Sequence, residues 1–202
     1  MTFDAYAPPR SGHLIAPEGV YIIKRPFFSF FDRTFRAFNA AQELVMFVRH
    51  PLMRLREQFQ VFADEAMQQP LAQIQARQMI AINFNYDVSD PQTGGWLGTL
   101  RSRGLKSIIR DTWDLLDQQE QPIGLMTEDG MSILRRIMPI LPGHWHVELG
   151  GRHVANIDQT FRFFTKEYRL TIHAEGVNID PRYLMACALL ALMRENRREE
   201  RN

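Results

Sequence analysis

The sequence predicts a mainly β fold in which about 12 antiparallel strands, arranged as repeated hairpins, form a barrel closed around a buried C-terminal α-helix. Three observations lead to this prediction. A hairpin-like unit recurs along the chain, the apolar residues of each unit alternate with a period of two, and one segment near the C-terminus is apolar on every side.

The recurring unit has the pattern of a β-hairpin. Each copy begins with an aromatic residue, has an apolar residue two positions later, and continues through a turn into a second apolar strand. The clear copies begin at Phe59, Tyr86, Trp113 and Trp145, and a fainter copy begins at Phe35. Alternation with a period of two is typical of a half-buried strand, so the copies predict five antiparallel hairpins.

The predicted turns contain residues that favour tight reversals of the chain. Asp64, Asp90 and Asp117 recur at the same place in three copies, and Gly150 and Gly151 occupy it in the fourth. Asp and Gly are common turn residues because of local side-chain hydrogen bonds and positive φ, respectively. We therefore interpret the recurring aspartates as turn residues and not as catalytic carboxylates.

Two flanking segments extend the predicted sheet. Residues 20–24, VYIIK, form a strand before the first hairpin, and residues 160–173 form a further pair that turns at Lys166 and Glu167. About a dozen short antiparallel strands at regular spacing are typical of a sandwich or a barrel.

A central helix is predicted at about residues 181–193. Asp180 suits the N-cap and Pro181 the first helical position. Residues 183–193, YLMACALLALM, are apolar on all sides and include Cys187 and Leu189. Such a helix must be buried all round, either inside the barrel or against an oligomer partner. A membrane-spanning helix needs about 20 apolar residues, so we expect no transmembrane span.

The chain is expected to form one domain over residues 14–193, with a flexible arm at 1–13 and a charged tail at 194–202. The single cysteine excludes an internal disulfide, and the start of the chain lacks the features of a signal peptide. These features favour a cytoplasmic protein. The net charge of +1 gives no overall attraction to nucleic acid, which we do not expect as a partner.

The densest basic cluster consists of Arg101, Arg103, Lys106 and Arg110. Alternation places Arg101 and Arg103 on one strand face, where they could bind the phosphates of an anionic phospholipid or phosphoinositide. The alternative is a solvated outer face of the barrel, and in either case we expect their removal to leave stability unchanged. A second cluster, Arg49, Arg54 and Arg56, has the same two interpretations.

The sequence gives little support for a metal site or a catalytic site. His144, His146, Glu148 and His153 project to one side of a predicted hairpin and are weak candidates for a zinc site, but solvated histidines are the preferred interpretation. The sequence contains no Gly-rich phosphate loop, nucleophile elbow or HExxH motif. We therefore predict no metal, no cofactor and no enzymatic activity.

The order of these pieces resembles the tubby C-terminal-like superfamily, and within it the phospholipid scramblase and LURP-one-related branch. The pieces that carry the resemblance are residues 55–74, residues 107–126 and the helix that begins after Asp180. The resemblance implies a barrel of about 12 strands around a central C-terminal helix. It also implies functions without covalent chemistry, namely binding or translocation of phospholipids or phosphoinositide-dependent attachment to membranes.

The sequence departs from the scramblases at two places. It lacks their palmitoylated cysteine stretch, and residues 173–180 offer only Glu175, Asn178 and Asp180, whereas calcium takes six to eight oxygen ligands. We expect a non-enzymatic lipid-binding protein that is peripheral to a membrane. Phospholipid scrambling is a further expectation, and only the family resemblance implies it. The alternative is a soluble structural or protein-interaction module without a lipid role. A lipocalin-like carrier would need an empty lumen, which the central helix would fill.

Overall fold

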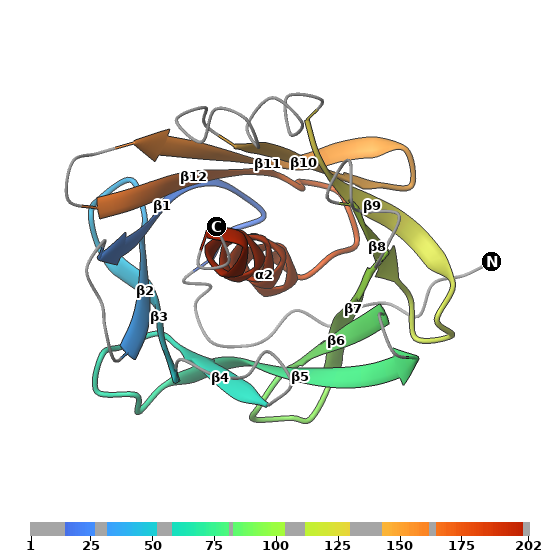
Figure 1. Cartoon of the computed structure of the whole chain (residues 1–202), viewed down its shortest axis with the longest axis horizontal. Helices are drawn as coiled ribbons and strands as arrows, with labels where there is room; N and C mark the ends of the chain where they lie inside the picture. The colour runs from blue at the N-terminus through green and yellow to red at the C-terminus, as the bar shows by residue number, and fades with distance from the viewer. Residues whose placement is uncertain are drawn as a thin grey trace.

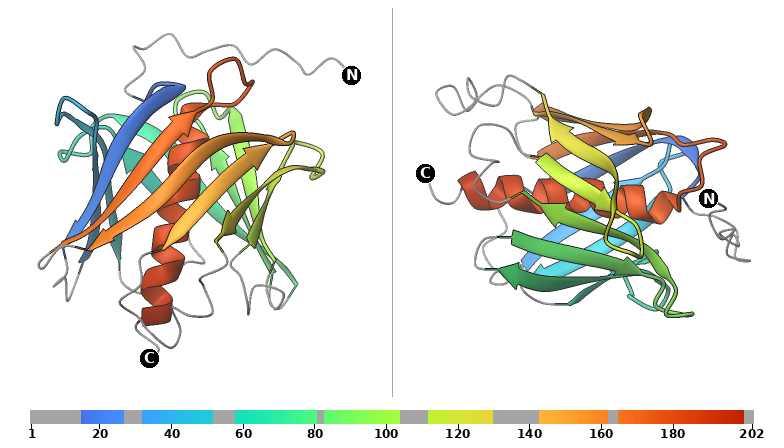
Figure 2. Two further views of the ribbon diagram at one scale, coloured as in Figure 1. Left: turned by 90° about the horizontal axis from the view of Figure 1, so that it is seen from above. Right: turned by 90° about the vertical axis from the view of Figure 1, so that its right-hand side faces the viewer.

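A computed structural model describes residues 15–26, 32–51, 58–80, 83–103, 112–129, 143–161 and 165–199. In this part of the chain, twelve antiparallel strands form one closed barrel. Each strand pairs with its neighbours in sequence, and β1 (Glu18–Pro26) pairs with β12 (Thr165–His173) to close the ring. The helix α2 (Pro181–Glu199) runs through the middle of the ring (Figures 1 and 2). The predicted barrel around a C-terminal helix is therefore confirmed.

The five predicted hairpins are all present. Their strands are β2 (Asp32–Phe38), β3 (Leu44–Pro51), β4 (Phe59–Phe62), β5 (Pro70–Ile80), β6 (Asn83–Ser89), β7 (Trp96–Ser102), β8 (Thr112–Leu116), β9 (Pro122–Glu128), β10 (His144–Leu149) and β11 (Arg152–Phe161). The predicted extra turn at Lys166 and Glu167 was wrong, because both residues lie within β12 and pair with Phe161 and Thr160. Residues 160 and 161 are the end of the long strand β11, which the alternation pattern had divided in two.

Four turns at one end of the barrel are built alike and confirm the turn role of the aspartates. They open with Asn39, Asp64, Asp90 and Asp117. Asp117 Oδ1, for example, accepts hydrogen bonds from the backbone N of Gln119 at 2.9 Å and of Gln121 at 2.8 Å. In three of these turns the residue three positions later has positive φ: Gln42 (62°), Met67 (58°) and Glu120 (60°). A left-handed residue of this kind reverses the chain and joins the two strands of a hairpin.

The interior of the barrel is filled by α2. Every residue from 183 to 193 is at most 3% exposed, and Cys187 and Leu189 are completely buried. Gly98 of β7 allows the close approach of the helix, because a Cβ atom there would lie 2.4 Å from the ring of Tyr183. The hydroxyl of Tyr183 donates a hydrogen bond to the carbonyl of Thr99 at 2.7 Å. The burial predicted for this segment is confirmed.

The two ends of α2 are set by polar contacts. Asp180 Oδ1 accepts a hydrogen bond from the backbone N of Arg182 at 2.8 Å, as expected of an N-cap, and Pro181 is the first helical residue. At its other end the helix continues past the predicted limit at residue 193 to Glu199. It continues because Arg194 packs over the Trp113 ring and Glu195 accepts a hydrogen bond from Tyr168 at 3.3 Å.

Within the described residues, no helix combines the length and apolar character needed to cross a bilayer. The predicted arm at residues 1–13 and the last residues of the predicted tail, 200–202, lie outside the described part of the chain.

Candidate anion-binding site

The structure describes half of the predicted basic cluster. Arg101 lies near the end of β7, and Arg103 follows the last residue of that strand. Lys106 and Arg110 lie outside the described residues. Leu100 and Ser102 are buried on the inner side of β7, so alternation places Arg101 and Arg103 together on the outer face of the barrel, as predicted.

Asp114 of β8 holds these two arginines side by side. Asp114 is the register partner of Arg101, its Oδ2 lies 3.0 Å from Arg101 Nη2, and its Oδ1 lies 2.8 Å from Arg103 Nε. The Asp114 side chain is only 5% exposed, whereas both guanidinium groups reach solvent. One carboxylate therefore lies beneath two cations, and the group keeps one positive charge at the surface.

The electrostatics of Asp114 follow from this geometry. Burial by itself would raise the pKa of Asp114, but the hydrogen bonds and charges of Arg103 and Arg101 outweigh it and hold the pKa below its ordinary value. The same contacts correct the expectation that these arginines can be removed without loss of stability. Their removal leaves a buried carboxylate unpaired, which destabilises a protein. Sequence reasoning missed Asp114 because only the β7–β8 register brings it to Arg101.

Asn85 of β6 is a further residue that the sequence did not reveal. It is the register partner of Arg101 on the side away from Asp114, and its side chain is 0% exposed. Neither its Nδ2 nor its Oδ1 has a hydrogen-bond partner among the described residues. Buried amides are nearly always hydrogen-bonded, so this one is an unsatisfied polar group next to Arg101 in the sheet.

The next arginine along this face has its charge already neutralised. Arg77 of β5 is the register partner of Asn85 on its other side, and it forms ion pairs with Asp87 and, at 2.9 Å from Nη1 to Oε1, with Glu120. Thr99 Oγ1 also donates to Asp87 at 2.7 Å. The candidate site therefore consists of Asn85, Arg101 and Arg103 above Asp114, and Arg77 marks its boundary.

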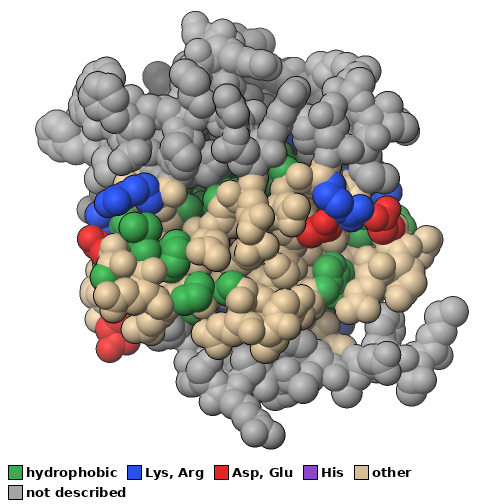
Figure 3. All heavy atoms as spheres, turned by 90° about the horizontal axis from the view of Figure 1, so that it is seen from below, with side chains coloured by type: hydrophobic (Ala, Val, Ile, Leu, Met, Phe, Trp, Pro, Cys, Tyr) green, Lys and Arg blue, Asp and Glu red, His purple; other side chains and the backbone are tan. Residues whose placement is uncertain are grey.

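The second predicted basic cluster is only partly described. Arg49 of β3 is exposed and lies over the ring of Phe47 at 5.9 Å, and Arg36 lies over the same ring at 5.3 Å. Arg36 also forms an ion pair with Glu65 at 2.7 Å. Arg54 and Arg56 lie outside the described residues. Figure 3 shows the basic side chains of this face in two separate groups, each next to acidic side chains.

The histidines of β10 and β11 do not converge on one point. Glu148 faces His153 across the ladder, as predicted. Each histidine has its own partner: His144 Nδ1 lies 2.9 Å from Asp158 Oδ1, His146 Nδ1 lies 2.9 Å from Asp129 Oδ1, and His153 Nε2 lies 2.8 Å from Asn156 Oδ1. Among the described residues, no group of three or more His, Cys, Asp or Glu is placed to hold a metal ion.

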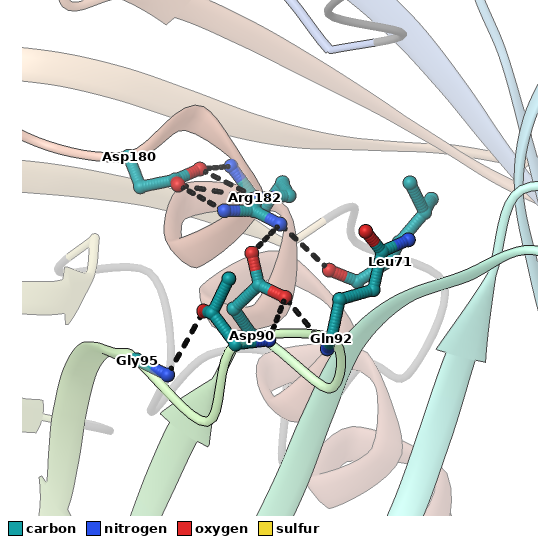
Figure 4. Close-up of polar contacts among 7 residues, drawn as sticks. Leu71, Asp90, Gln92, Gly95, Asp180 and Arg182 are labelled. Atoms are coloured by element: carbon teal, nitrogen blue, oxygen red, sulfur yellow. Dashed lines mark hydrogen bonds and ion pairs between the residues drawn. The ribbon is translucent and has the colours of Figure 1, made fainter. Parts of the chain in front are cut away.

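A second polar cluster lies where α2 enters the barrel (Figure 4). Arg182 binds Asp180 at 2.7 Å through Nη2, and through Nη1 it binds Asp90 at 2.9 Å and the carbonyl of Leu71 at 3.1 Å. Burial tends to raise the pKa of Asp90, but the hydrogen bonds from Arg182 and from the backbone N of Gln92 hold it below its ordinary value. Because these charges neutralise one another, the cluster joins α2 to the barrel wall instead of offering a free cation.

Comparisons of the chain with protein-family models, with curated proteins and with solved structures find no match. Function is therefore inferred from the geometry of the chain's own residues.

Proposed function

We propose that this chain is a non-enzymatic, scramblase-like protein that binds the phosphate groups of phospholipids or phosphoinositides at a membrane surface. The observation that carries the proposal is the pair of guanidinium groups, Arg101 and Arg103, fixed over buried Asp114 beside the unpaired amide of Asn85. Guanidinium groups bind phosphate oxygens through two parallel N–H donors, and a preorganised pair loses little side-chain entropy on binding. Lys106 and Arg110 belong to the proposed site as neighbours in sequence.

The architecture supports this proposal in two ways. A closed antiparallel barrel around a C-terminal helix is the fold that the resemblance to the scramblase and LURP-one-related branch implies. In addition, α2 occupies the space that a lipocalin-like carrier would need for a ligand inside the barrel. The proposal therefore concerns a ligand bound on the outer face, by a protein that is cytoplasmic and peripheral to the membrane.

Sedimentation with vesicles tests the proposal. Wild-type protein should bind phosphatidylcholine vesicles only when they contain phosphatidylserine or a phosphoinositide, and binding should weaken as salt is raised. The triple variant Arg101→Gln, Arg103→Gln, Asp114→Asn removes both cations without leaving the carboxylate unpaired. The site loses two positive charges and one negative charge, so its net charge falls by one. At about 1 kcal/mol for one charge near an anionic surface, the variant should bind about fivefold more weakly.

Arg169→Gln is the matched control, because Arg169 is exposed on β12, far from this site around the barrel. This variant should bind like wild type. Wild-type protein that ignores anionic vesicles at low salt, or a triple variant that binds as tightly as wild type, would rule out the proposed site.

The second candidate function is a protein-interaction module without a lipid role. The net charge of +1 favours it, as does the presence of acidic partners beside Arg36, Arg77, Arg101, Arg103 and Arg182. Failure of the wild-type protein to bind any anionic vesicle would favour this function.

A further inference from the structure

Four of the six histidines of the chain lie on one flank of the barrel. His144 and His146 belong to β10, His153 to β11 and His173 to β12, and these three strands are neighbours in the ring and form its upper side in Figure 1. Each of the four side chains is at least partly exposed. We name the outer face of these three strands the histidine flank.

Three of these imidazole rings form a row across the strands. The centroid of the His153 ring lies 6.5 Å from that of His146 and 6.1 Å from that of His173. This spacing is comparable with two N–H···O hydrogen bonds of about 2.8 Å each. Neighbouring imidazolium rings of the row can therefore both donate to one phosphate group, in charge-assisted hydrogen bonds.

Carboxylates lie beside the two histidines of β10. His144 Nδ1 lies 2.9 Å from Asp158 Oδ1, and His146 lies between Asp129, 2.9 Å from Nδ1, and Glu148, 3.9 Å from Nε2. A positive charge on either ring would therefore be neutralised by a carboxylate that is already in place.

The histidines of β11 and β12 have weaker acidic surroundings. His153 Nε2 lies 2.8 Å from the neutral side chain of Asn156, and Glu148, which faces His153 across the ladder, lies beside His146. His173 has Glu18 of β1 as its register partner. Protonation of these two rings therefore adds positive charge to the surface of the flank.

The histidine flank is net acidic while its histidines are neutral. The other charged side chains described there lie on its three strands, on the facing parts of β1 and β9, and just after β9 and β12. They are the six acidic residues Glu18, Asp129, Glu148, Asp158, Glu167 and Glu175 and the three basic residues Lys24, Arg152 and Arg169. Histidine changes its charge between about pH 5 and pH 8, whereas an ordinary carboxyl group, with a pKa of about 4, stays ionised at about pH 5. Protonation of four histidines therefore reverses the sign of the flank.

From these observations we propose that the histidine flank is a second, acid-dependent surface for binding anionic phospholipid. The choice of ligand rests on the proposed function, but the surface shares no residue with the arginine site on β7, from which β8, β9 and β10 separate β11. At neutral pH the acidic flank repels an anionic bilayer. In acid, His153 and His173 together offer two cations and their N–H donors to the phosphates of the head groups.

Sedimentation with phosphatidylserine vesicles at about pH 7.5 and about pH 5 tests this surface. The variant His153→Gln, His173→Gln should bind like wild type at the higher pH. At the lower pH it should bind about thirtyfold more weakly than wild type, because two cations near an anionic surface are lost. The control is His50→Gln on β3, which β2, β1 and β12 separate from β11, and it should bind like wild type at both pH values. Equal binding of the double variant and wild type at the lower pH overturns the inference.

Fixed cations should produce the opposite change. The variant His153→Lys, His173→Lys should bind about thirtyfold more tightly than wild type at about pH 7.5, because its two added charges do not depend on acid. No gain in this variant also overturns the inference.

The arginine site and the histidine flank are distinguished by the variant Arg101→Gln, Arg103→Gln, Asp114→Asn. It should still bind more tightly at about pH 5 than at about pH 7.5, since its histidines are intact. Wild-type protein that ignores anionic vesicles at the higher pH but binds them at the lower pH through His153 and His173 would overturn the proposed arginine site and support the histidine flank.

Discussion

Arg182 in the first turn of α2 and Asp90 in the β6–β7 turn form an ion pair, with 2.9 Å between Nη1 and Oδ2. Their side chains are only 14% and 10% exposed, so the pair is largely shielded from water. The same guanidinium binds Asp180 and the carbonyl of Leu71. Since most of the remaining contacts of α2 are apolar and non-directional, this cluster fixes the depth and rotation of the helix within the barrel.

Replacing Arg182 with Met should destabilise the protein by about 3–5 kcal/mol. The substitution keeps much of the side-chain volume but leaves the buried carboxylates of Asp90 and Asp180 without their cation. Urea unfolding followed by tryptophan fluorescence measures the change. Arg169→Met, at an exposed position of β12, is the control and should alter the free energy of unfolding by well under 1 kcal/mol. Equal stability of the two variants would contradict the structural role of the cluster.

Stability should fall in acid through Asp90 and Asp114. In the folded protein the pKa of each carboxyl lies below its ordinary value, because hydrogen bonds from arginine outweigh the opposite effect of burial. A depressed folded pKa contributes stability that is complete above the unfolded pKa of about 4 and is lost as the pH falls through the folded pKa. The free energy of unfolding, measured in urea between pH 6 and pH 2, should therefore decrease below about pH 4.

The double variant Asp90→Asn, Asp114→Asn distinguishes the contribution of these two carboxyl groups to the acid-induced loss of stability from that of the other carboxyl groups. It should be less stable than wild type at neutral pH and should show a shallower dependence on pH in acid, because two of the linked protons are absent. A slope identical to that of wild type would mean that neither carboxyl is linked to folding.

Gly98→Ala should destabilise the barrel through the packing of α2. A Cβ atom at residue 98 would lie 2.4–2.6 Å from ring atoms of Tyr183, which is buried and hydrogen-bonded to Thr99. Overpacking of this kind typically destabilises a protein by about 1–3 kcal/mol. Thermal unfolding of the single variant and of Gly98→Ala with Tyr183→Leu tests the cause. Gly98→Ala should cost less stability when it is added to Tyr183→Leu than when it is added to wild type. An equal cost in both backgrounds would show that the effect does not come from the Tyr183 ring.

The fold could be predicted because its determinants are local in sequence. Alternation within each hairpin, Asp at three equivalent turns and the all-round apolar residues 183–193 each indicate an element without knowledge of its neighbours. The continuation of α2 beyond Met193 could not be predicted in this way. Arg194 and Glu195 look like solvated tail residues, and only their contacts with Trp113 and Tyr168 of distant strands show otherwise.

The candidate site could be predicted only in part, for the same reason. Arg101 and Arg103 stand out as a local cluster of charge, but Asp114 and Asn85 are brought to them by the register of β6, β7 and β8. A one-residue shift of register would turn either side chain to the other face of the sheet.

Cys187 should be inert in the folded protein, because it is completely buried and burial raises the pKa of its thiol well above the ordinary value. Thiolate is the reactive form, so both low access and low ionisation slow its modification. A chromogenic thiol reagent should label no cysteine in native protein and one cysteine after denaturation.

The variant Gln92→Cys provides a positive control. Its exposed Cys at position 92 should react at once in native protein, and its buried Cys187 should react only after unfolding. Labelling of Cys187 should be faster in Arg182→Met than in wild type, because loosening the helix raises the population of open states. Rapid stoichiometric labelling of native wild-type protein would mean that α2 does not stay within the barrel in solution.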